Sequence, residues 1–186
     1  MKRLGTILLF AALASAQLAP SEHYVKYAPP EKVSVAAGRP AVVEFDFRVN
    51  QGMHINSDKP KSEFLIPTKL RFMPPTDIAV GKLQYPPAEE LELSFSKEKL
   101  SVYTGDFKIK AQLSASRSAT TGPYTVHGEL KYQACNDKAC FPPKTLPIAF
   151  NIVVEKAKPG SGGVTQQKAP GTGKKNPPQS PHIKPR

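Results

Sequence analysis

The chain has 186 residues, of which 26 are Lys or Arg and 15 are Asp or Glu, giving a formal net charge of +11. Most of the excess positive charge lies at the two ends of the chain. Lys2 and Arg3 precede a long apolar run, and residues 156–186 hold seven basic residues and no acidic one. Residues 17–155 are nearly balanced, with 17 basic and 15 acidic residues. Because the charge belongs to the tail, the high isoelectric point does not indicate a nucleic-acid surface, and we predict no nucleic-acid partner.

The first 16 residues have the pattern of a secretory signal peptide. Lys2 and Arg3 form the positive segment, residues 4–13 are apolar, and Ala14-Ser15-Ala16 is a small-residue cleavage site. We therefore predict a signal peptide at 1–16, a mature chain from Gln17, and a periplasmic or otherwise exported location for a protein that is soluble after cleavage. An uncleaved anchor is the alternative, although the apolar run is short for a membrane span.

Residues 17–156 are predicted to form one all-β domain. Apolar and polar residues alternate along four long segments, which indicates strands with one buried face. Prolines and glycines separate the segments, and no stretch shows the apolar stripe of a helix. This pattern favours an immunoglobulin-like antiparallel β-sandwich, with a barrel or jelly roll as the alternative. The long segments are 43–49, 107–113, 124–134 and 146–154, and shorter candidates are 32–36, 53–56, 68–73 and 78–85.

Residues 157–186 are predicted to be a disordered, basic, Pro- and Gly-rich tail. The segment has almost no large apolar side chains, so it cannot bury enough surface to offset the entropy cost of ordering. Its role is either that of a solvated terminus or that of a weak electrostatic tether to an anionic envelope surface.

Two cysteines, Cys135 and Cys140, flank a plausible hairpin turn, Asn136–Ala139, between two strong strand patterns. Such a turn brings the cysteines close enough to bond. Continued alternation from Lys131 and Gln133 places Cys135 on the outer face, so we expect the disulfide at the surface. A structural staple is one interpretation, although a loop this short contributes only about 2 kcal/mol. An exchanging disulfide is the other, since exposed short-loop disulfides are open to attack by thiolates.

No metal or cofactor site is predicted. The four histidines lack ligand spacing with the cysteines, and each is expected to be a surface or strand residue. Signatures of hydrolytic triads, paired carboxylates and phosphate loops are also missing from the sequence. The four histidines are His23, His54, His127 and His182.

The run Tyr132-Gln133-Ala134-Cys135…Cys140-Phe141-Pro142-Pro143-Lys144 resembles the N-terminal periplasmic domain of the thiol:disulfide interchange protein DsbD family. The resemblance covers about residues 30–155. It is supported by Gly52–Asn56 and by Tyr103, which leads into the strand pattern at Phe107. The best-studied family members have one more residue between the cysteines. They also continue into a membrane domain and a thioredoxin-like domain that this sequence lacks.

The resemblance implies an immunoglobulin-like fold whose cysteine pair shuttles between dithiol and disulfide. Cys140 would form mixed disulfides with thioredoxin-like partners, and Cys135 would resolve them. Phe95 matches the phenylalanine of a cap loop that shields the pair in that family, and an ordinary core aromatic is the alternative for it. With no membrane domain of its own, the chain would need a separate membrane electron donor.

Three hypotheses follow for the function. The first is a thiol-disulfide oxidoreductase of the protein-disulfide reductase type, acting as an electron-transfer module. The second is an immunoglobulin-like binding adaptor with a purely structural hairpin disulfide. The third is association with the envelope through the tail. The reduction potential of the cysteine pair separates the first two.

Overall fold

The computed structural model describes residues 23–93, 96 and 98–157, which form twelve β-strands. The strands are β1 (Val25–Ala28), β2 (Val33–Ala36), β3 (Pro40–Val49), β4 (His54–Asn56), β5 (Lys69–Met73), β6 (Ile78–Gln84), β7 (Glu89–Leu91), β8 (Leu100–Tyr103), β9 (Asp106–Ala115), β10 (Gly122–Tyr132), β11 (Ala134–Cys135) and β12 (Lys144–Glu155). The predicted signal peptide and the predicted tail beyond Ala157 lie outside the described residues and remain predictions. Within the described part of the chain, no helix could cross a membrane.

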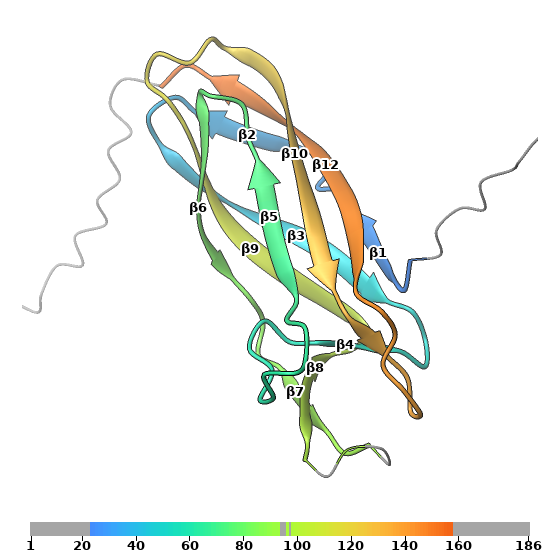
Figure 1. The fold of residues 1–186 in the computed structure, drawn as a ribbon. Coiled ribbons are helices and arrows are strands. Elements are labelled where there is room, and N and C mark those ends of the chain that lie inside the picture. The colour runs from blue at the N-terminus through green and yellow to red at the C-terminus, as the bar shows by residue number, and fades with distance from the viewer. Residues whose placement is uncertain (1–22, 94–95, 97, 158–186) are drawn as a thin grey trace, which may run out of the picture.

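Two four-stranded sheets pack face to face (Figure 1). One has the order β1-β3-β9-β6 and the other the order β2-β12-β10-β5. The ladder between β2 and β12 is parallel, and the other ladders between these strands are antiparallel. This arrangement confirms the predicted immunoglobulin-like β-sandwich.

The core between the two sheets is built from the alternating apolar residues of the long strands. On β3, Val43, Phe45, Phe47 and Val49 are buried, as the alternation predicts. Phe45 meets Phe72 of β5 and Phe150 of β12, with ring centroids 4.9 Å apart in both pairs. Burying each such side chain stabilises the fold by about 1.5–3 kcal/mol, so this aromatic cluster is a main contact between the sheets.

A third, smaller sheet with the order β11-β4-β8-β7 lies at one end of the sandwich (Figure 1). Its strands β7 and β8, like β1, were not predicted. All four residues of β8 are buried, so that strand shows no alternation, and β7 has only three residues. Tyr103 ends β8, and Gly105, with a φ of 50°, turns the chain before β9 begins. This end of the molecule also carries the cysteines.

Candidate functional site

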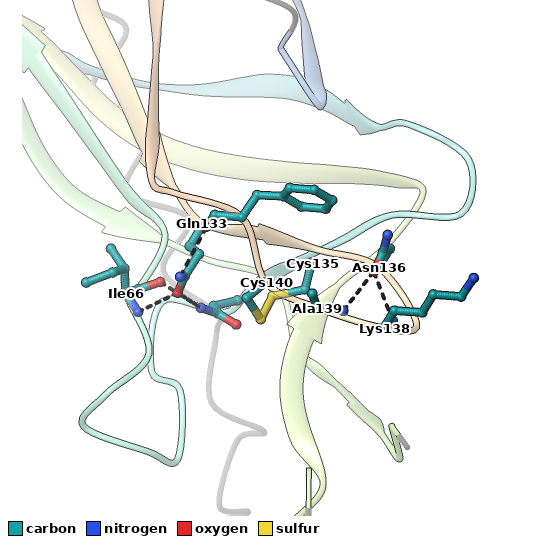
Figure 2. Close-up of a disulfide and its surroundings, with 9 residues drawn as sticks. Ile66, Gln133, Cys135, Asn136, Lys138, Ala139 and Cys140 are labelled. Atoms are coloured by element: carbon teal, nitrogen blue, oxygen red, sulfur yellow. Dashed lines mark hydrogen bonds between the residues drawn. A yellow bond between two sulfur atoms is a disulfide. The ribbon is translucent and has the colours of Figure 1, made fainter. Parts of the chain in front are cut away.

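Cys135 and Cys140 form a disulfide with an S–S distance of 2.03 Å and a Cα–Cα distance of 3.9 Å (Figure 2). The β10–β12 ladder runs from Gly122 opposite Val154 to Tyr132 opposite Lys144. The two cysteines face each other in an isolated bridge beyond the last pair of that ladder. The predicted hairpin and the predicted pairing are both confirmed.

The turn between the cysteines is closed by Asn136. Its Oδ1 accepts hydrogen bonds from the backbone N–H groups of Lys138 and Ala139, both at 2.9 Å. Its own N–H donates to the Ala139 carbonyl at 3.0 Å. An asparagine that satisfies the backbone of its own turn in this way pre-orders the hairpin, and so holds Cys140 opposite Cys135.

The prediction that Cys135 lies on the outer face is wrong. Strand β10 ends at Tyr132, and after Gln133 the chain enters β11, which pairs with β4 instead of continuing the hairpin ladder. Ala134 keeps the buried side that the alternation predicts, but in β11 the alternation ends, and Cys135 is buried as well. Cys135 is 0% exposed, whereas Cys140 is half-buried. The disulfide is therefore asymmetric, with one residue inside the protein and the other at its edge.

The side-chain amide of Gln133 holds the segments around the disulfide together (Figure 2). Its Oε1 accepts from Asn56 Nδ2 at 3.0 Å and from the Ile66 N–H at 3.1 Å, and its Nε2 donates to the Phe141 carbonyl at 3.2 Å. Asn56 Nδ2 also donates to the Ile66 carbonyl at 3.0 Å. One side chain thus links β4, the loop after it and the segment that follows Cys140.

Aromatic residues pack together beside the segment that follows Cys140. The rings of Tyr24 and Phe141 lie 5.1 Å apart, and Lys144 Nζ lies 4.5 Å from the Tyr24 ring centroid. The Tyr24 N–H donates to the Tyr132 hydroxyl at 3.0 Å. Burial raises the pKa of Tyr132, so this hydroxyl stays protonated. Phe141, directly after Cys140, is therefore packed against Tyr24, the residue before β1.

His54 lies directly opposite Cys135 in the β4–β11 ladder. The side chain is 4% exposed, burial lowers its pKa, and its Nε2 atom has no hydrogen-bond partner. Sequence reasoning placed His54 in a strand but gave it no role. Its position beside the disulfide depends on a ladder between short strands that no local sequence pattern specifies.

Phe95, the predicted cap residue, lies outside the described residues. Among the residues that the structure describes, no group of three or more His, Cys, Asp or Glu side chains could hold a metal ion. The chemistry available at the site is that of the two sulfurs and the polar groups beside them.

Comparison with known proteins agrees with this chemistry. Residues 24–151 match the family model described as thiol:disulfide interchange protein DsbD, N-terminal. No curated protein sequence is significantly similar to the chain.

Two solved structures have related descriptions. The N-terminal domain of Neisseria meningitidis DsbD in its reduced form is 19% identical, over 57% of this chain and 73% of that one, with a TM-score of 0.38. The N-terminal periplasmic domain of ScsB from Proteus mirabilis is 10% identical, over 70% of this chain and 48% of that one, with a TM-score of 0.45. The match to the family model spans most of the chain and includes both cysteines and Gln133; the protein belongs to the family of the DsbD N-terminal domain.

Proposed function

We propose that this protein is an exported thiol–disulfide exchange module that passes electrons between thioredoxin-like partners through Cys135 and Cys140. The proposal rests on the match to the family model, which includes both cysteines. The hairpin disulfide that they form, with one residue buried and the other at the edge, supports it. The predicted signal peptide would bring the protein to a compartment in which disulfides persist. The electron donor that we propose is a separate membrane protein.

The difference in burial supports Cys140 as the sulfur that partners attack. A thiolate approaches a disulfide in line and must reach the sulfur that it attacks. Cys140 lies at the edge of the protein, and Cys135 lies inside it. In the reduction of this protein, a partner thiolate would bond to Cys140 Sγ, the Cys135–Cys140 bond would break, and its electron pair would leave on Cys135 Sγ.

The reverse half of the cycle reduces a partner. Cys140 thiolate would attack the partner's disulfide and form a mixed disulfide, and one partner sulfur would leave as a thiolate. Cys135 would then attack Cys140 Sγ, re-form the internal disulfide and release the second partner thiolate. The internal dithiol is oxidised and the partner disulfide is reduced by the same two electrons.

Trapping tests these roles. Cys135→Ala should accumulate a mixed disulfide between Cys140 and an oxidised thioredoxin-like protein, because no thiol remains to resolve it. Cys140→Ala should accumulate little, because its remaining cysteine is buried. Equal trapping by both variants, or trapping by Cys140→Ala alone, would contradict the assignment.

The second candidate function is a binding adaptor with a structural disulfide. The burial of Cys135 and the hydrogen bonds of Gln133 favour it, since both are features of a rigid hairpin. If neither cysteine variant traps a partner and the folded protein resists reduction by dithiothreitol, this second function replaces the first.

A further inference from the structure

We propose that His54 is the residue that exchanges a proton with Cys135 during the redox cycle. The inference rests on the proposed thiol–disulfide exchange and adds a residue to it. Three observations carry it: the position of His54, the state of its Nε2 atom, and the need of a buried thiol for a proton acceptor.

The first observation is the backbone register. In the antiparallel ladder of β4 and β11, Cys135 lies opposite His54 and Ala134 lies opposite Ile55. Directly opposite residues of antiparallel strands project their side chains to the same face, with Cβ atoms about 4.5–5.5 Å apart. An imidazole is long enough to span that separation to the neighbouring sulfur. Both side chains are buried, at 4% and 0% exposure, so bulk water has little access to the thiol.

The second observation is that His54 Nε2 is buried without a hydrogen-bond partner. Buried polar atoms are nearly always hydrogen-bonded, and one that is not calls for an explanation. In the oxidised protein the neighbouring sulfur belongs to a disulfide and has no proton to donate. Reduction creates a Cys135 thiol, which supplies a donor for this nitrogen in the tautomer that carries its proton on Nδ1.

The electrostatic surroundings are consistent with this role. Burial is the one cause of the lowered pKa of His54, and no charged side chain contributes to it. The facing titratable residue on β11 is Cys135. On β8 the neighbouring titratable residue in the ladder is Tyr103, opposite Ile55, and its hydroxyl donates to Asp58 Oδ1 at 2.5 Å. The imidazole is therefore neutral at pH 7 and able to accept a proton.

The third observation is chemical. To resolve a mixed disulfide, the Cys135 thiol must lose its proton, since only the thiolate is a nucleophile. The proton would move from Cys135 Sγ to His54 Nε2, and the Cys135 thiolate would attack Cys140 Sγ. The bond between Cys140 and the partner would break, and its electron pair would leave on the partner sulfur. That thiolate then takes up the proton from the imidazolium, so that His54 returns to its neutral state.

A small disulfide separates the two steps. When the reduced protein reacts with 5,5′-dithiobis(2-nitrobenzoate), the first coloured thiolate reports the attack by Cys140, and the second reports the resolution by Cys135. His54→Gln keeps a hydrogen-bonding side chain of similar reach but cannot take up a proton. We expect it to slow the second release by about a hundredfold, the lower end of what a positioned general base contributes, and to leave the first release unchanged.

The matched control is His127→Gln, since His127 is exposed on β10. It should release both thiolates at the wild-type rates. The rate of the second release in the wild type should rise with pH through the pKa of His54, and in His54→Gln this rise should be replaced by one that follows the ionisation of the Cys135 thiol at higher pH. Equal second-step rates and pH profiles in the wild type and His54→Gln would overturn the inference.

A second measurement uses the wild-type protein alone, so it does not require that a variant folds. Titration of the His54 ring by NMR should give a lower pKa in the reduced protein than in the oxidised one, because a hydrogen bond from the Cys135 thiol to Nε2 favours the neutral imidazole. An unchanged His54 pKa would overturn the inference. Failure of the proposed function has a different signature, namely no second release by the wild type and no trapping of a partner.

Discussion

Gln133 Nε2 donates a hydrogen bond of 3.2 Å to the carbonyl of Phe141, so the residues that flank the cysteine pair are tied together across the hairpin. The same side chain binds Asn56 and Ile66 through its Oε1. The geometry of the disulfide thus depends on an amide that lies outside the disulfide loop itself.

Replacing Gln133 by Leu should lower the free energy of unfolding by about 1–3 kcal/mol, because the Ile66 N–H and the Phe141 carbonyl lose their partner. Urea denaturation of the oxidised protein measures this loss. Gln112→Leu, at an exposed position of β9, is the matched control and should change stability by less than about 0.5 kcal/mol. Equal stabilities of the two variants would show that the amide network does not hold the hairpin.

Tyr103 positions the loop that leaves β4. Its hydroxyl donates to Asp58 Oδ1 at 2.5 Å, and its ring stacks on Phe107 with centroids 5.2 Å apart. Tyr103→Phe keeps the ring and removes the bond to a carboxylate, so we expect a loss of about 1.5–3 kcal/mol in thermal or chemical unfolding.

The control for this variant is Tyr124→Phe. The Tyr124 hydroxyl donates an exposed hydrogen bond of 3.0 Å to the neutral Thr120 carbonyl. Loss of this bond should lower the free energy of unfolding by about 0.5–1.5 kcal/mol. A Tyr103→Phe protein that is no less stable than Tyr124→Phe would contradict a special role for the Asp58 contact.

His54 should make the stability of the domain fall at mildly acidic pH. Burial lowers the pKa of the folded-state imidazole, whereas the unfolded chain keeps a pKa of about 6.5. As the pH falls below that value, the unfolded chain takes up a proton that the folded protein resists. Stability is therefore complete above about pH 6.5 and is lost towards the folded-state pKa, at a slope of up to about 1.4 kcal/mol per pH unit.

Urea unfolding at pH 7 and pH 5.5 measures this dependence. The loss on acidification should be smaller in His54→Gln than in the wild type, and His127→Gln should behave as the wild type does. Identical losses in His54→Gln and the wild type would show that the buried imidazole does not carry the effect.

The sequence was most informative where a strand has one buried face. Val43, Phe45, Phe47 and Val49 follow strict alternation because β3 packs one side on the core. Strand β8 could not be predicted in this way, since all its residues are buried in the small end sheet and none alternates with an exposed one. The hairpin of the cysteines could also be predicted, because turn residues stand between two strong strands.

The position of Cys135 could not be predicted by alternation. The prediction extended the alternation of exposed residues from Lys131 to Cys135 and so assumed an unbroken strand. The chain instead changes its ladder partner at Gln133 and pairs with β4. The same change brings His54 beside the cysteine. Both facts depend on contacts between residues about 80 positions apart in the sequence, and local patterns carry no information on such pairings.

The reduction potential of Cys135–Cys140 tests the central claim most directly. The protein would be equilibrated in buffers of defined glutathione or thioredoxin potential, and the fraction of free thiol would be measured by alkylation and mass spectrometry. An exchanging pair should have a potential above about −300 mV, within reach of thioredoxin-like partners. A potential below about −300 mV would mark the disulfide as a structural staple and contradict the proposed function.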